Sequence, residues 1–105
     1  MTPDRLFKAL SDPTRRGLFE RLCRDGELTV HALTAGGTIS QPAVSKHLAA
    51  LKQAGLVTIR PDGRFTHYAA RPEALAPLVS WTRAYTAFWN SRMDALNTLL
   101  HRMDQ

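Results

Sequence analysis

Three polar side chains in the stretch ISQPAVSKHLAALKQAGLV, residues 39–57, have the chemistry to read the edges of nucleic-acid bases. Gln41 carries an amide that suits adenine, Lys46 carries an ammonium that suits guanine, and Ser45 carries a hydroxyl that can donate or accept. Small apolar groups such as Pro42 can meet the methyl group of thymine. These residues are candidates for contact with DNA, provided that one element presents them together.

The flanking residues predict that this element is a helix from Gln41 to Ala54. Ser40 is a good N-cap, Pro42 falls in the first turn, where a missing N–H costs nothing, and Gly55 can end the helix. The helix would carry one apolar stripe, because Val44, Leu48 and Leu51 are spaced i, i+4, i+7.

The candidate residues face away from that stripe. At about 100° per residue, Pro42 and Lys46 lie nearly opposite it, and Gln41 and Ser45 flank them. An ordinary surface helix is the alternative interpretation. However, a helix that only has to be soluble more usually carries Glu and Lys pairs four residues apart, whereas the front of this one is nearly uncharged.

The preceding segments favour a helix-turn-helix. Thr29 can cap a short helix, VHALTA, which Gly36-Gly37 would end with a tight change of direction. In this arrangement the second helix can enter the major groove. Two earlier helices are predicted, each with a cap and then a proline, at Thr2-Pro3 and at Asp12-Pro13. The second should run to about Arg24.

The segment LVTIRPDGRFTHYAA, residues 56–70, predicts a two-stranded wing. Alternating apolar residues begin the first strand, Pro61-Asp62-Gly63 forms a hairpin turn, and the return strand runs from Phe65 to Tyr68. Arg60 and Arg64 would lie at the tip and contact DNA. The alternative for both arginines is solvated charge in a turn.

The last segment predicts a short turn at 72–75 and a long helix from about Pro77 to Met103. Its apolar stripe is too wide and too aromatic to cover so small a core from one side, so we interpret it as a dimer interface formed with the first helix. The predicted interface residues are Leu6, Leu78, Trp81, Tyr85, Phe88, Trp89 and Leu96. Closure of the chain's own core, or a pocket for a hydrophobic ligand, are the alternatives.

The length and composition of the chain limit the classes of protein to which it can belong. The chain has 105 residues, so we expect one domain over 1–105, and its net charge of +5 favours an anionic partner such as nucleic acid. No membrane span and no signal peptide are evident, which predicts a cytoplasmic protein. The single cysteine, Cys23, excludes an internal disulfide and is interpreted as a small core residue. No catalytic motif stands out, so we predict no enzyme activity and no cofactor.

The segments LSDPTRRGLFERL, SQPAVSKHLAALKQAGLV and GRFTHYAARPEALAPLV together resemble the ArsR/SmtB family of bacterial winged-helix repressors. The resemblance covers about residues 4–100. It implies a homodimer joined through its first and last helices, which binds an inverted repeat in double-stranded promoter DNA and often regulates its own operon. Gln41, Pro42, Ser45 and Lys46 match DNA-facing positions, and Arg64 matches the wing tip. His47 matches a common family histidine, and because it borders the apolar face of its helix we interpret it as a packing residue or a phosphate contact.

This sequence departs from the family members that sense metals. Its third helix holds His31 but no cysteine, and Asp94, His101 and Asp104 do not match the spacing of the zinc-binding members. The aromatic last helix is similar instead to a metal-free subgroup, so we predict no metal site; the effector, if any, is unknown. We therefore expect a mainly α winged helix-turn-helix of about five helices and a two-stranded wing. The alternatives are a metal- or redox-responsive repressor of the same fold, and a winged-helix module that binds protein.

Overall fold

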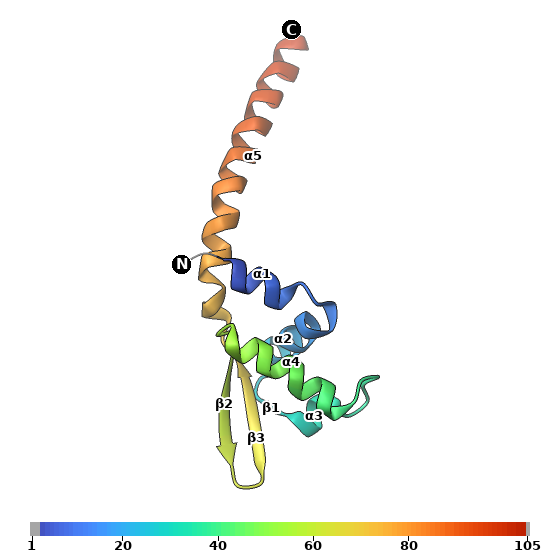
Figure 1. Cartoon of the computed structure of the whole chain (residues 1–105). Coiled ribbons are helices and arrows are strands. Elements are labelled where there is room, and N and C mark those ends of the chain that lie inside the picture. Colours follow the sequence, from blue (N-terminus) through green and yellow to red (C-terminus); the bar gives the residue numbers. More distant parts are fainter. Residues whose placement is uncertain (1–2, 105) are drawn as a thin grey trace. The chain divides into compact units, whose positions relative to one another are not determined.

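The computed structural model describes residues 3–104, which form five α-helices, one 3-10 helix and three strands (Figure 1). The chain divides into two compact units, Met1–Leu75 and Ala76–Gln105. The first unit contains α1 (Asp4–Leu10), α2 (Pro13–Asp25), β1 (Leu28–Thr29), α3 (Val30–Thr34), α4 (Gln41–Gln53), β2 (Val57–Asp62), β3 (Phe65–Ala70) and a 3-10 helix (Pro72–Leu75). The second unit consists of α5 (Ala76–Met103). The prediction of a mainly helical winged fold is confirmed.

Three helices of the first unit begin at the predicted caps. The Asp12 carboxylate accepts a hydrogen bond of 3.0 Å from the Arg15 backbone N–H at the start of α2. Thr29 and Ser40 cap α3 and α4 in the same way. The predicted cap at Thr2 lies outside the described residues. Because each cap satisfies an otherwise unpaired N–H, the short loops between these helices end at defined residues.

Helix α4 is fixed by its buried stripe and by its C-terminal turn. Val44, Leu48 and Leu51 are at most 1% exposed. The Leu56 N–H donates to the Leu51 carbonyl, while Gly55 has a φ of +81° and donates to the Lys52 carbonyl. This is the Schellman arrangement, in which a glycine takes the left-handed conformation. The apolar side chains of Leu51 and Leu56 are both fully buried beside it.

The sheet has three antiparallel strands in the order β1-β3-β2, whereas the sequence predicted two. The added strand is β1, whose Leu28 and Thr29 pair with Tyr68 and His67 of β3. Two residues are too few for a recognisable alternation, which is why the pattern did not predict it. The strand ties the base of the wing to the start of α3.

The predicted turn at Pro61-Asp62-Gly63 was wrong by two residues. Pro61 and Asp62 belong to β2, and the turn consists of Gly63 and Arg64, since Asp62 pairs with Phe65. Gly63 has a φ of +60°, and a glycine at the first position of a two-residue turn is typical of tight hairpins. Pro61 is tolerated because β2 lies at the edge of the sheet.

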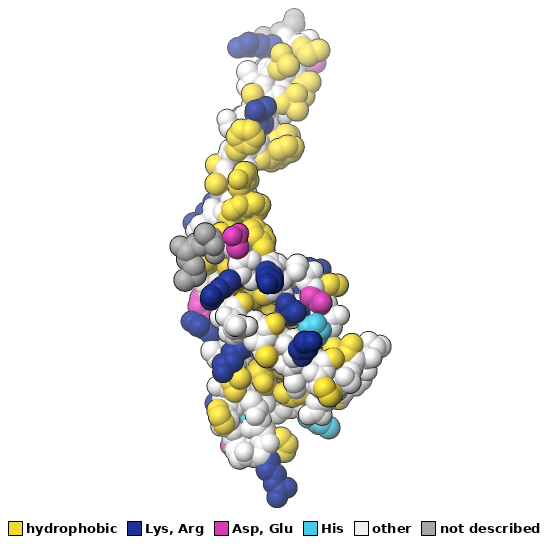
Figure 2. Space-filling view, viewed as in Figure 1, with side chains coloured by type: hydrophobic (Ala, Val, Ile, Leu, Met, Phe, Trp, Pro, Cys, Tyr) yellow, Lys and Arg dark blue, Asp and Glu magenta, His cyan; other side chains and the backbone are white. Residues whose placement is uncertain are grey.

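Helix α5 confirms the predicted long helix and begins one residue earlier, at Ala76. Every described residue from Val79 onward is exposed, including the aromatic ones. Figure 2 shows apolar side chains along the whole length of this helix. No helix within residues 3–104 has the length and apolarity required to cross a membrane.

Candidate nucleic-acid interface

The outward face of α4 holds the four residues that the sequence singled out for base contact. Gln41, Pro42, Ser45 and Lys46 are all exposed. Their backbone lies in the first turns of the helix, behind the Ser40 cap, and the buried stripe fixes which way they point. An amide, a hydroxyl and an ammonium therefore stand on a rigid element, and within residues 3–104 none of these three groups makes a side-chain hydrogen bond.

A hollow of about 400 Å³ joins this face to the wing. It is lined by Thr29, Val30, His31, Gln41, Arg64, Phe65 and Thr66, and we call it the wing hollow. It brings Gln41, which we predict to contact bases, beside the predicted wing-tip residue Arg64, although the two are 23 positions apart in the sequence. A neutral amide and a guanidinium at the two sides of one open hollow suit a base edge and a phosphate, respectively.

The sequence did not predict the other residues of the wing hollow. His31 is exposed at the start of α3, and Thr29 and Thr66 belong to adjacent strands. Phe65 is 57% exposed directly after the turn. These residues lie beside Gln41 because β1 pairs with β3. The sequence pattern did not predict this pairing, and without it these residues could not be assigned to the site.

The two arginines of the wing have different surroundings, which corrects the prediction that both lie at the tip. Arg64 is in the turn itself and forms no ion pair with another residue of 3–104. Arg60 lies inside β2, opposite His67, and its guanidinium donates two hydrogen bonds to Glu27. Asp62 lies 3.7 Å from the same guanidinium. Arg64 is thus the cation available to a ligand at the tip.

Glu27 ties the wing to the loop before β1. Hydrogen bonds from the Arg60 side chain hold the pKa of Glu27 below its ordinary value, and Glu27 in turn raises the pKa of Arg60. His67 Nδ1 lies 3.5 Å from the Glu27 carboxylate. The pairing partly neutralises the middle of the wing, so positive charge is concentrated at its turn.

His47 is half-buried on the side of α4 that faces α2. Its Nδ1 is buried and has no hydrogen-bond partner within residues 3–104. Its charge would be close enough to lower the pKa of Asp12, although the Arg15 backbone hydrogen bond is the larger cause. Between the two roles predicted for His47, this position favours packing, and a phosphate contact stays a prediction.

The predicted dimer residues fall into two groups. Leu6 is only 5% exposed and belongs to the buried set. On α5, Leu78 is half-buried, while the other predicted residues are between 44% and 62% exposed: Trp81, Tyr85, Phe88, Trp89 and Leu96. The Trp81 and Tyr85 rings lie 4.8 Å apart, and the Arg92 guanidinium lies 4.7 Å from the Phe88 ring centre. Such a face is far larger than the isolated apolar residues usual on a protein surface.

Cys23 is exposed, so its interpretation as a core residue was wrong. At about 100° per residue it lies about 140° around α2 from Leu18, beyond the edge of the buried stripe. Partial desolvation nevertheless raises the pKa of its thiol, which disfavours the reactive thiolate form. Within residues 3–104, no three His, Cys, Asp or Glu side chains are grouped to hold a metal ion.

Comparison with known proteins places these features in a family. A family model described as bacterial regulatory protein, arsR family, matches residues 12–58, the span from the start of α2 to β2. The HTH-type transcriptional regulator Rv2034 of Mycobacterium tuberculosis is 45% identical over 92 residues, which cover 83% of this chain and 85% of that protein. The transcriptional repressor SdpR of Bacillus subtilis is 36% identical over 76 residues, covering 72% of this chain and 83% of SdpR.

Solved structures agree in fold. The crystal structure of an ArsR family transcriptional regulator, RHA00566, has a TM-score of 0.74 and 31% identity, covering 87% of this chain and 96% of that one. The homodimeric winged helix-turn-helix DNA-binding domain of Mb0332 from Mycobacterium bovis, a possible ArsR-family regulator, has a TM-score of 0.63 and 28% identity. That match covers 80% of this chain and 77% of the Mb0332 domain.

The Glu27–Arg60 pair predicts an unusual titration. Because the pKa of Glu27 is lowered, the pair is intact above the ordinary glutamate pKa and is lost only as the pH falls through the lowered value. An NMR titration of the Glu27 side chain should show this lowered pKa, and Arg60→Gln should move it back up. Arg16→Gln, which removes an arginine that pairs with Glu20, is the control and should leave it unchanged. An ordinary pKa for Glu27 in the unmodified protein would contradict the pairing.

Proposed function

This chain belongs to the arsR family of bacterial regulatory proteins, and from that premise we propose that it acts as a homodimer on an inverted repeat in the promoter of its own operon. Within the family it is a DNA-binding transcriptional repressor of winged helix-turn-helix fold. The proposal adds the oligomeric state, the form of the operator and autoregulation. It also assigns the chain a binding role, in the cytoplasm, with no catalysis.

The observation that carries the proposal is the wing hollow, which joins the front of α4 to the tip of the hairpin. Gln41 and Ser45 are placed to read base edges in the major groove, with Pro42 beside them. Lys46 can contact either a guanine or a phosphate. Arg64 at the turn suits the backbone or the minor groove, where it adds affinity with less discrimination. Arg60 contributes indirectly, since its pairing with Glu27 holds β2 in place.

The exposed face of α5 supports the homodimer. A face that carries Trp81, Tyr85, Phe88 and Trp89 at 44–62% exposure needs an apolar partner, and a second copy supplies an identical face. Mb0332, a structural neighbour, is homodimeric. A two-fold dimer presents two α4 helices to two half-sites, which is why its operator should be an inverted repeat.

We assign the protein to the metal-free subgroup. The short helix α3, VHALT, has no thiolate to offer a soft metal. Cys23 is exposed, but its raised pKa makes a redox-sensing role less favourable than it would be for a thiolate. The protein-binding alternative is tested directly by DNA binding itself.

Affinity for DNA should depend steeply on salt. A dimer that contacts roughly 6–10 phosphates releases the condensed counterions, so its affinity should fall by about 10³–10⁵ between about 50 and 200 mM salt. Fluorescence anisotropy with a labelled random duplex measures this slope. An affinity that stays flat over this range would remove DNA as the partner and leave the protein-binding alternative.

Truncating the aromatic face should weaken the dimer. Loss of a Trp side chain that is buried between two copies typically costs about 3–5 kcal/mol, so Trp89→Ala should shift sedimentation toward monomer at micromolar concentration and reduce DNA binding with it. Asn90→Ala is the matched control, because the next residue points about 100° away, off the apolar stripe. A monomeric unmodified protein under these conditions would show that the assignment of the interface is wrong.

A further inference from the structure

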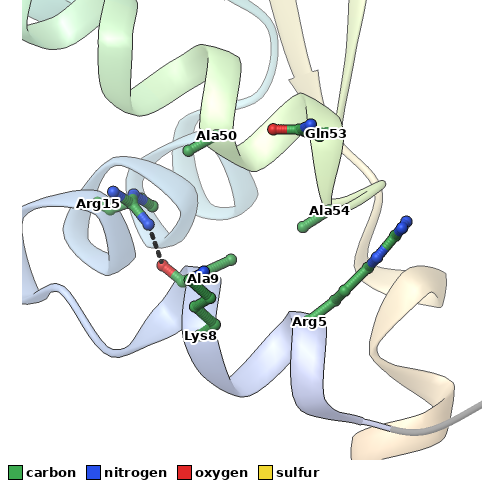
Figure 3. Close-up of a pocket in the computed structure, with 7 residues that line it drawn as sticks. All are labelled: Arg5, Lys8, Ala9, Arg15, Ala50, Gln53 and Ala54. Atoms are coloured by element: carbon green, nitrogen blue, oxygen red, sulfur yellow. Dashed lines mark hydrogen bonds between the residues drawn. The ribbon is translucent and has the colours of Figure 1, made fainter.

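A second hollow, of about 270 Å³, lies in the first unit where α1 and α2 meet the C-terminal end of α4. Its lining consists of Arg5, Lys8, Ala9, Arg15, Ala50, Gln53 and Ala54 (Figure 3). We call it the basic hollow. Figure 3 shows Gln53 on α4 and Arg5 on α1 at one side of the hollow, and Arg15 on α2 at the other, joined to Ala9 by a hydrogen bond. None of these residues belongs to the predicted DNA contacts.

The charge of the basic hollow is one-sided. Arg5, Lys8 and Arg15 are cations, and no carboxylate lines the hollow. None of the three forms an ion pair with a residue of 3–104. Five other arginines of the first unit do find carboxylates, namely Arg16, Arg21, Arg24, Arg60 and Arg71. Three like charges around one small space repel one another, and a bound anion would relieve this repulsion.

Arg15 supplies a donor that the fold leaves unused. Its Nη1 lies 3.5 Å from the Ala9 carbonyl at the end of α1, which holds the guanidinium against the wall of the hollow. Its Nε is buried and has no hydrogen-bond partner among the described residues. Buried donors are normally satisfied, so an unused one beside a basic hollow indicates a missing acceptor.

We propose that the basic hollow binds a small anion with one or two carboxylate or phosphate groups. Arg5 and Lys8 lie one turn apart on α1 and can supply charge-assisted hydrogen bonds, while the Gln53 amide can donate from α4. The hollow lies just below the usual size range of about 300–1,000 Å³ for small-molecule pockets, so it suits a compact metabolite and not a nucleotide cofactor.

The position of the basic hollow separates this anion from the DNA backbone. Ala50 and Ala54 follow Gln41 and Ser45 by nine residues each, which is about 180° around α4 and about 13 Å along its axis. Gln53, however, lies within about 20° of Lys46 around the helix, so it is the distance along the axis that separates the hollow from the predicted base contacts at the other end of α4. This placement favours a small anion free in solution as the ligand. A phosphate of duplex DNA is the alternative ligand, which the test distinguishes.

The test is an NMR titration of the full chain with pyrophosphate and, separately, succinate, at constant ionic strength set with chloride. The Arg15 Nε–H and the Gln53 side-chain amide should shift and saturate. Arg5→Gln and Lys8→Gln should each raise the dissociation constant about tenfold, as expected when one charge-assisted contact is lost. Lys8→Arg should keep most of the affinity. Arg24→Gln removes an exposed cation at the far end of α2 and should change nothing.

Three results would overturn the proposal. Shifts that grow linearly without saturating, or an equal loss in Arg24→Gln, would mean that the anions only screen the net charge. Shifts of Arg15 and Gln53 that require random duplex DNA and are absent with both small anions would make the hollow a backbone contact. Thermal melting of each variant confirms that it is folded, which is expected because Arg5 and Lys8 are exposed.

Discussion

The complete burial of one side of α4 is the constraint on which the candidate interface depends. Val44, Leu48 and Leu51 are at most 1% exposed, so the helix cannot rotate without exposing apolar side chains, at about 1.5–3 kcal/mol for each. The Ser40 cap and the Gly55 turn fix where the helix begins and ends. As a consequence, the side chains of Gln41 and Ser45 occupy defined directions, and neither makes a hydrogen bond with another residue of 3–104, which leaves their polar groups available to another molecule.

The small sheet places the second half of the interface. Strand β1 holds β3 beside the start of α3, and this brings Arg64, Phe65 and Thr66 to the front of α4. Glu27 fastens β2 through Arg60, so the charge that is free to act lies at the turn and not along the strand. The proposed roles, in which α4 reads the bases and the turn adds affinity, agree with this difference, since Arg60 has a carboxylate partner and Arg64 has none among residues 3–104.

The sequence predicted the features that depend on local chemistry. The caps at Asp12, Thr29 and Ser40, the glycine after α4 and the length of α5 all follow from neighbouring residues, and the structure has each of them. It did not predict β1 or the pairing of Arg60 with Glu27, because these depend on residues that are far apart in the chain. The turn was misplaced because Pro61 and Asp62 are typical turn residues, although both belong to β2. Cys23 was misplaced because it lies just past the edge of the apolar stripe of α2, where residue spacing alone does not distinguish a buried position from an exposed one.

The central claim is that the front of α4 reads sequence while the wing tip adds affinity, and paired binding measurements on two variants test it most directly. Both are measured on the proposed operator, an inverted repeat upstream of the protein's own gene, and on random duplex. Gln41→Ala should reduce the binding free energy for the operator by about 1–3 kcal/mol and change that for random DNA little. Arg64→Ala should weaken both by similar factors and lower the salt slope by about one unit. Equal losses on both duplexes for Gln41→Ala would contradict the account, because α4 would then position the protein without reading the bases.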